Sequence, residues 1–398
     1  MAVRKVADGV FAVTASDKRI QYFENLFPVP EGASYNSYVV ADEKNAVLDG
    51  ADAAVADEFL NGVEKILGER KLDYIIVNHL EPDHSAALKN LMNKYPEAKL
   101  VGNAKTKAMA GLYLDAARVA EMQVVADGET LSLGKRSLTF VMTPMVHWPE
   151  SMVAYDAADG ILFAQDAFGA FGSVDGCLFD DEADFGEAYI DEMRRYYANI
   201  VGKFGAQVAA VLKKVAALDV KVICPIHGLI IRKRIAEVVK LYSQWSGYVP
   251  EMRGAVIACA SMYGNTKRAA YELAAKLAER GVREIVVRDL GKTDVSYVVA
   301  DAFKYSNIVV ASVCYNGGLY PKTEALLTDF KALNVQNRAF SLVENGSWAP
   351  NAAKLMKEKI DTLKNARYVG ETVTMRGSIL DETALDALAD ALAADIKA

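Results

Sequence analysis

Residues 77–84 read Val-Asn-His-Leu-Glu-Pro-Asp-His and follow the apolar run 74–77, whose β-branched residues predict a buried strand. Four potential metal ligands, His79, Glu81, Asp83 and His84, would then lie on the loop that leaves this strand. Because Pro82 lacks a backbone donor and disfavours helix at Glu81, we expect an extended or turned loop that sends Glu81 and Asp83 to one side. A solvated acidic turn is the simpler alternative. The density of ligand-type side chains favours a binuclear metal site.

Length and composition describe an ordinary globular chain. With 398 residues, 52% hydrophobic and 24% charged, the sequence predicts two or three domains that each bury a core. No apolar run reaches the roughly 18 residues that cross a bilayer, and the first residues lack the apolar core of a signal peptide. We therefore expect a cytoplasmic protein with no membrane partner.

The charge is unevenly placed along the chain. Residues 251–398 hold 19 Lys+Arg and 18 Asp+Glu, a net charge of +1, and the remaining 26 and 34 leave −8 on residues 1–250. Since no basic patch is present, nucleic acid is not an expected partner. Part of the acidic excess is available for metal ligation.

The four cysteines lie far apart and form no C-x-x-C motif: Cys177, Cys224, Cys259 and Cys314. This spacing argues against a rubredoxin module, a thiolate-bound zinc ion or an iron–sulfur cluster within this chain. We interpret most of them as small core residues in a reducing compartment.

Two different patterns of predicted secondary structure divide the chain into two parts. Residues 1–250 begin with short antiparallel strands and continue with helices between strands, including a helix expected from about residue 85 to 94. This mixture predicts a sheet sandwich flanked by helices. The pattern breaks around residues 246–250, and from residue 255 strands and helices alternate strictly. We therefore predict a second domain, residues 251–398, built on a doubly wound parallel sheet.

The other two of the four histidines, His147 and His227, also follow predicted strands, as does the carboxylate Asp166. A single histidine after a strand is usually a hydrogen-bonded structural residue, and Asp166 alone could cap a turn. All four histidines on strand-end loops form a stronger pattern, because such loops gather functional residues in α/β folds. The set predicts one shared site.

This ligand pattern, H-x-E-x-D-H followed by His147, Asp166 and His227, resembles the flavodiiron version of the metallo-β-lactamase-like domain, an αβ/βα sandwich. Hydrolases of that superfamily typically show H-x-H-x-D-H and bind zinc. Here Glu81 takes the place of the second histidine, and the harder, more anionic donor favours iron. The resemblance implies that His79, Glu81 and His147 hold one iron, that Asp83, His84 and His227 hold the other, and that Asp166 bridges them. His84 swings away from the iron in some members.

A second motif follows the first strand of the β-α series: Ser261-Met262-Tyr263-Gly264-Asn265-Thr266. Hydroxyls, backbone amides and a helix N-terminus suit a phosphate dianion. The motif is neither G-x-G-x-x-G nor G-x-x-x-x-G-K-[ST], which disfavours dinucleotides and nucleoside triphosphates. It resembles the FMN-phosphate loop of flavodoxins, although an ordinary polar turn is the alternative.

Two later loops supply glycines and aromatics where a flavin ring would need them. The first resembles the Y-N-G-G-L-Y-P segment of flavodiiron proteins, and the second is less typical of that family. The residues expected to contact FMN in these loops are Val313, Cys314, Tyr315, Asn316, Gly317, Gly318, Tyr320, Asn345, Gly346, Ser347 and Trp348.

The resemblance covers nearly the whole chain and implies a flavodiiron protein of the two-domain kind. Such proteins reduce O2 to water and, to varying degrees, NO to N2O, with electrons that pass from rubredoxin or a similar small carrier through FMN to two irons. The family assembles as a head-to-tail homodimer or a dimer of dimers. Two alternatives remain: a binuclear zinc hydrolase with an appended flavodoxin domain, and a non-catalytic flavodoxin-like electron carrier. The preference for O2 or NO depends on packing around the site, which no motif reports.

Overall fold

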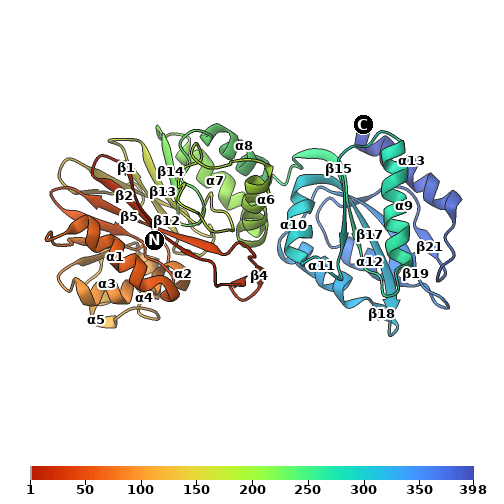
Figure 1. Ribbon diagram of the computed structural model, residues 1–398, viewed down its shortest axis with the longest axis horizontal. Helices are drawn as coiled ribbons and strands as arrows, with labels where there is room; N and C mark the ends of the chain where they lie inside the picture. Colours follow the sequence, from red (N-terminus) through yellow and green to blue (C-terminus); the bar gives the residue numbers. More distant parts are fainter. Residues whose placement is uncertain (1) are drawn as a thin grey trace. The chain divides into compact units, whose positions relative to one another are not determined.

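The computed structural model describes residues 2–398, which divide into two compact units (Figure 1). The first unit runs to Tyr197 and continues over Ala206–Ser243, and the second holds Ala198–Gly205 and Gln244–Ala398. The domain limits of 1–250 and 251–398 remain a prediction. Among the described residues, no helix is both long and apolar enough to cross a membrane.

The first unit contains a 7-stranded sheet in the order β1-β2-β5-β6-β7-β8-β9. Its first four strands pair antiparallel, and β6 to β9 pair parallel. A separate pair, β3 and β4, forms a small antiparallel ribbon. The strands are β1 (Ala2–Ala7), β2 (Val10–Asp17), β3 (Tyr22–Phe23), β4 (Phe27–Pro28), β5 (Ala33–Ala41), β6 (Asn45–Leu48), β7 (Tyr74–Ile76), β8 (Lys99–Gly102) and β9 (Gln123–Val124).

A 5-stranded sheet in the order β10-β11-β12-β13-β14 completes the sandwich. The strands are β10 (Thr130–Ser132), β11 (Ser137–Met142), β12 (Met152–Asp156), β13 (Ile161–Gln165) and β14 (Val222–Pro225). Side chains of both sheets meet in one apolar core, in which Tyr38 and Leu48 of the first sheet join Phe140 and Phe163 of the second. The predicted sandwich is confirmed.

Helices flank the two sheets, α1 to α5 on the side of β1, β2 and β5 and α6 to α8 on the side of β12 to β14 (Figure 1). Helix α1 shows why they pack: Phe59, Val63 and Leu67 recur every fourth residue and are buried. The helical segments are a 3-10 turn (Ala53–Val55), α1 (Ala56–Leu67), α2 (Pro82–Ser85), α3 (Leu88–Lys94), α4 (Ala104–Ala110), α5 (Ala116–Ala120), α6 (Glu187–Tyr196), a π turn (Tyr197–Val201), a 3-10 turn (Gly202–Phe204), α7 (Gly205–Val215) and α8 (Ile235–Ser246).

The ligand loop after β7 differs from its predicted form. Glu81 is extended, at φ −58° and ψ 134°, but Pro82 opens the short helix α2, which contains Asp83 and His84. The loop is therefore extended at Glu81, as expected, and forms a single helical turn after it, because proline disfavours helix in the residue before it and is itself suited to the first helical position. The helix expected from about residue 85 also begins later, at Leu88.

The second unit is a parallel sheet in the order β16-β15-β17-β19-β20, with β21 paired to β19 and the short β18 antiparallel to β17. The strands are β15 (Met252–Cys259), β16 (Ile285–Asp289), β17 (Tyr305–Tyr315), β18 (Gly318–Leu319), β19 (Ala339–Asn345), β20 (Arg367–Tyr368) and β21 (Val373–Met375). This order is that of flavodoxin-like folds, and it confirms the doubly wound sheet.

Five helices cover this sheet: α9 (Asn265–Glu279), α10 (Val295–Lys304), α11 (Pro321–Ala332), α12 (Ala352–Ile360) and α13 (Glu382–Lys397). Helices α9 and α13 contact each other and share an apolar core with β15 and β17, to which Leu273 and Leu392 contribute. Helix α11 contacts both α10 and α12. The strands end between these two helical layers and continue into loops.

Candidate functional site

Every side chain predicted to bind a metal ion lies in a segment that follows a strand of the first unit. His79 and Glu81 follow β7, and Asp83 and His84 occupy the first turn of α2. His147, Asp166 and His227 follow β11, β13 and β14. The strand-end prediction therefore holds for each of them, and the side chains from both sheets converge on one cluster.

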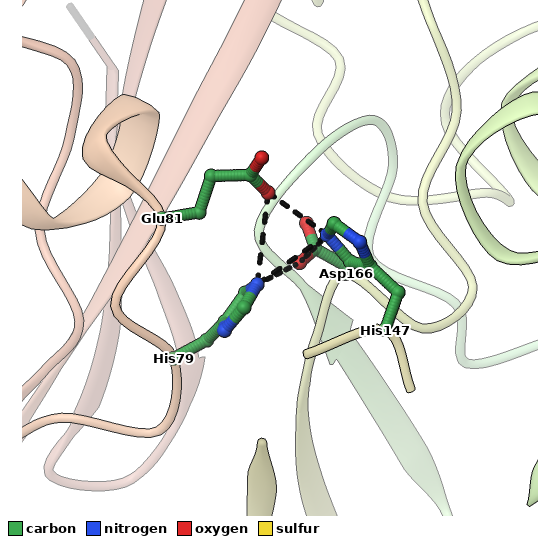
Figure 2. Close-up of side chains that lie close together, drawn as sticks. All are labelled: His79, Glu81, His147 and Asp166. Carbon is green, nitrogen blue, oxygen red and sulfur yellow. Dashed lines mark hydrogen bonds and ion pairs between the residues drawn. The ribbon is translucent and has the colours of Figure 1, made fainter. Parts of the chain in front are cut away.

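One half of the cluster gathers around an oxygen of Asp166 (Figure 2). Asp166 Oδ2 lies 3.2 Å from His79 Nε2 and 3.4 Å from His147 Nε2. Glu81 Oε2 lies 2.9 Å from the same nitrogen of His147 and 3.6 Å from that of His79. Two imidazoles and two carboxylates thus present their ligand atoms to a single point.

The other half lies on the far side of Asp166. His227 Nε2 is 3.1 Å from Asp83 Oδ2 and 3.5 Å from Asp166 Oδ1. His84 Nε2 is 3.4 Å from Asp83 Oδ1 and 3.7 Å from Asp166 Oδ2. Asp166 therefore faces both halves. Glu81 and Asp83 both reach the cluster, as predicted, but they face different histidines.

Burial and nearby charges have opposite effects on the pKa values of the side chains in this cluster. Burial works to lower the pKa of His79, but hydrogen bonds to Glu150 and Glu81 outweigh it and raise the pKa to about 9. Burial likewise opposes protonation of His227, whose close contacts with Asp166 and Asp83 raise its pKa to about 10. For Asp166, close contacts with the surrounding histidines overcome burial and hold its pKa well below the usual range.

Several inward-facing atoms have no hydrogen-bond partner in the described part of the chain, although they are buried. They are both oxygens of Asp83, both ring nitrogens of His84, Oδ2 of Asp166 and Nε2 of His227. Buried polar groups are normally hydrogen-bonded, because leaving one unpaired costs about 1–3 kcal/mol. Cations bound between the carboxylates and imidazoles would satisfy these atoms, so the donor set fits two metal ions.

The residues that orient these ligands were not foreseen from the sequence. Glu150 Oε1 lies 2.6 Å from His79 Nδ1, and Asp49 accepts the backbone N–H of Asn78 at 2.7 Å. Tyr196 donates its hydroxyl to Asp166 Oδ1 at 2.7 Å. Glu150 carried one usable signal, a carboxylate three residues after His147, whereas Asp49 and Tyr196 reach the site only through tertiary packing.

The second unit contains a cavity of about 540 Å³ at the carboxyl ends of β15, β17 and β19. Its lining consists of Ser261, Met262, Tyr263, Asn265, Thr266, Val313, Cys314, Tyr315, Asn316, Gly317, Asn345, Gly346, Ser347, Trp348, Ala349 and Gly377. All three loops predicted to contact a flavin therefore meet at one cavity. Its volume is typical of small-molecule and cofactor sites.

Three residues predicted to contact the flavin do not line this cavity. Gly264 has a φ of +93° and forms the turn that opens α9, where its N–H donates to Ser261 Oγ at 3.0 Å. Gly318 pairs with Tyr315 across the β17–β18 turn. Tyr320 precedes α11 and packs its ring edge-on against Tyr315, with centroids 5.9 Å apart. These residues contact lining residues of the cavity, Ser261 and Tyr315, and do not line it themselves.

Ala349 and Gly377 line the cavity although the sequence did not single them out. Asn345 explains the second: its amide accepts the N–H of Gly377 at 2.9 Å and donates to the Gly377 carbonyl at 2.9 Å. This pairing brings the loop after β21 to the cavity. The short β21 left no strong strand signal by which it could have been found.

Comparison with known proteins agrees with both halves of this picture. Residues 33–228 match the model of a family described as ODP family beta lactamase. A nitric oxide reductase of Moorella thermoacetica is 31% identical over 90% of each chain. The chain belongs to the flavodiiron protein family. It is an oxidoreductase by this membership.

Solved structures of flavodiiron proteins have the same fold as this chain. The rubredoxin oxygen:oxidoreductase of Desulfovibrio gigas superposes with a TM-score of 0.91 at 28% identity, covering 100% of this chain and 99% of that one. The flavodiiron protein of Giardia intestinalis superposes with a TM-score of 0.86 at 25% identity, covering 100% and 98%. The two units therefore occur together in known family members.

Proposed function

We propose that this flavodiiron protein transfers electrons through FMN to a non-haem diiron centre, where O2 is reduced to water, NO to N2O, or both. The observation that carries the proposal is the donor set of the first unit, four imidazoles and three carboxylates around one buried point. Carboxylate-rich sites favour iron over zinc and stabilise its ferric charge. The cavity of the second unit supplies a matching place for a flavin.

We divide the ligands into two sets as the family resemblance implies. His79, Glu81 and His147 would hold one iron. Asp83, His84 and His227 would hold the other, with Asp166 between the two sets. When bound, two adjacent irons supply electrons and Lewis acidity to both ends of a small diatomic molecule.

The chain's own residues prepare this site. Burial, reinforced by the charge of Asp166, raises the pKa of Tyr196 well above its usual value, so the phenol keeps its proton and donates to Asp166 Oδ1. Phe23 packs edge-on against His227, with ring centroids 5.3 Å apart, and keeps water from that ring. Glu81 and Asp83 keep some exposed surface, 12% and 15% of their side chains, and mark the side from which a gas can enter.

The flavin would lie in the cavity of the second unit, with its phosphate at the loop 261–266 and its ring against the loops 313–317 and 345–348. The N-terminus of α9 favours an anion, because its first backbone N–H groups have no side-chain cap and the helix dipole is positive there. Tyr315 and Trp348 offer aromatic faces for the ring. Electrons would enter from rubredoxin or a similar small carrier. A head-to-tail homodimer, or a dimer of dimers, would bring each flavin to the partner's irons.

The test is a purification under iron-replete, anaerobic conditions, followed by metal and flavin analysis and by gas consumption with reduced rubredoxin. We expect two irons and one FMN per chain and turnover of O2, NO or both. Two zinc ions without iron, together with hydrolytic turnover, would contradict the proposal and favour a metallo-hydrolase. Flavin without metal or gas turnover would favour an electron carrier. The ratio of O2 to NO consumption then determines the preferred gas.

A further inference from the structure

The histidines of the metal cluster differ in what lies behind them. Nδ1 of His79 is 2.6 Å from a carboxylate oxygen of Glu150, and neither side chain has any exposed surface. Nδ1 of His227 is 2.8 Å from the backbone carbonyl oxygen of Ser34, which is neutral. Nδ1 of His84 has no hydrogen-bond partner in the described residues. Among these three rings, only that of His79 thus has its Nδ1 hydrogen-bonded to a carboxylate in the described residues.

The two proposed ligand sets have the same composition. Each contains two imidazoles and one carboxylate, and both face Asp166. The directly ligating groups therefore give both positions the same formal charge. A difference between the two irons has to come from groups that lie behind the ligands.

Glu150 is held so that its charge acts on His79. The same oxygen that meets Nδ1 also accepts the N–H of Leu80 at 3.0 Å, and the backbone carbonyl of Glu150 accepts the amide of Asn103 at 2.5 Å. The other carboxylate oxygen, Oε2, is buried without a partner in the described part of the chain. A buried charge beside a buried ring is weakly screened, so its effect on the ring is much larger than at the surface.

We propose that Glu150 is a positioning residue that makes the two metal positions electronically unequal. With Nε2 of His79 turned toward the metal, Nδ1 carries the proton and donates it to Glu150, which fixes the tautomer and makes the ring a stronger donor. The position formed by His79, Glu81 and His147 therefore favours the more highly charged ion. This inference rests on the proposed diiron function.

The competing explanation is that Glu150 only ties the ligand loop to the segment after His147. Two substitutions separate these roles. Glu150→Gln keeps the shape of the side chain and an oxygen acceptor for Leu80 but removes the charge. Glu150→Leu removes the charge and the acceptor together. A purely structural tie predicts that the glutamine variant behaves as wild type, whereas the electronic role predicts that it does not.

The experiment uses full-length, iron-loaded protein and compares iron affinity, Mössbauer spectra and redox titrations. In Glu150→Gln, we expect one iron to bind about 10–100-fold more weakly, the range found for partners behind metal ligands. One quadrupole doublet should move while the other stays. The ferric ion should lose more affinity than the ferrous ion, and each tenfold difference raises the potential of that iron by about 59 mV.

Asp156→Asn provides the matched control, because Asp156 is a buried carboxylate at the end of β12 whose hydrogen-bond partners are Arg136 and Ala158 and not a proposed metal ligand. It should loosen the fold without selecting one doublet. The inference is overturned if Glu150→Gln leaves both doublets and potentials at their wild-type values, or if both irons shift equally. A wild-type protein that takes up no iron would overturn the diiron function itself, and this inference with it.

Discussion

The proposed metal cluster and the proposed flavin cavity lie in separate units, yet both are built on loops that follow parallel or mixed strands. They differ in how much of each is buried. The seven ligating side chains of the first unit are buried or nearly so, and Asp166 has no exposed surface. The cavity of the second unit is edged by Tyr263 and Trp348, which are each 90% exposed.

This difference shows two ways of specifying a site. The metal cluster depends on the chemical identity of buried side chains that face one another. The flavin cavity depends on backbone turns and on aromatic rings that have few contacts of their own. Substitutions in the first should therefore act on all properties of the site at once, and substitutions in the second should act on the ligand alone.

Replacing Asp166 with alanine should have the largest effect. Its two oxygens face both ligand sets, so its loss removes the shared ligand and leaves the four imidazoles without their common counter-charge. We expect both irons to be lost or mispaired and the flavin to remain. Metal analysis by mass spectrometry and the visible flavin spectrum measure the two separately.

Asp156→Ala is the control for this variant. Asp156 is also buried, at 1% exposure, but it lies at the far end of β12 and pairs with Arg136. Its loss should cost about 3–5 kcal/mol of stability and leave the iron content of the folded protein unchanged. Normal gas-reductase activity in Asp166→Ala would contradict the bridging role.

Removing the metals should destabilise the first unit and spare the second. A ligand that binds only the folded state stabilises that state by about 2.7 kcal/mol when its concentration is 100 times its dissociation constant. Calorimetry of chelator-treated protein should show that the first unit unfolds at a lower temperature. The unfolding temperature of the second unit should not change. If flavin removal shifted the same transition as chelation, the two sites would not be independent.

The sequence predicted that the side chains of the metal cluster lie together because their residue types carry their own signals, and their role as metal ligands stays a prediction. All four histidines follow strands, and apolar strands are recognisable by their residues. The local backbone was predicted less closely: Pro82 opens a short helix where an extended or turned loop was expected. Glu150 went unnoticed because a carboxylate in a turn has many ordinary uses, and only folding brings it to His79.

The cavity of the second unit is lined by the three loops that the motifs singled out, and the flavin contacts within them stay a prediction. Motifs identified the right loops, but they did not tell which residues of a loop line the cavity and which support it. Gly264 and Tyr320 turned out to support it. Gly377 joined through hydrogen bonds with Asn345, a pairing between segments 32 residues apart that periodicity does not reveal.

Replacing Asn345 with alanine should have a smaller effect than the loss of the metals. The substitution leaves the N–H and carbonyl of Gly377 without their partner, so the loop after β21 should move away from the cavity. We expect flavin affinity to fall about tenfold, equivalent to about 1.4 kcal/mol, with iron content unchanged. Flavin titration of the deflavinated protein, followed by fluorescence, measures it.

Asn307→Ala is the matched control for that variant. Asn307 is equally a buried asparagine of the same sheet, but it lies near the start of β17 and donates to Asp395 at 2.8 Å. It should lower the stability of the second unit and leave flavin affinity within experimental error. Equal losses of affinity in both variants would mean that Asn345 acts through stability and not through the loop.

Replacing Trp348 with alanine should have the smallest effect on the fold and a visible effect only on the flavin. Because the indole is 90% exposed, its removal should change the free energy of unfolding by less than about 0.5 kcal/mol. Loss of an aromatic contact with the flavin ring should weaken binding by about 0.5–1.5 kcal/mol. Leu112→Ala removes another exposed apolar side chain, 79% exposed and outside the cavity lining, and should change neither quantity. An unchanged flavin affinity in Trp348→Ala would show that this ring does not meet the flavin within its own chain, and would restrict the flavin ring contacts to the loop 313–317.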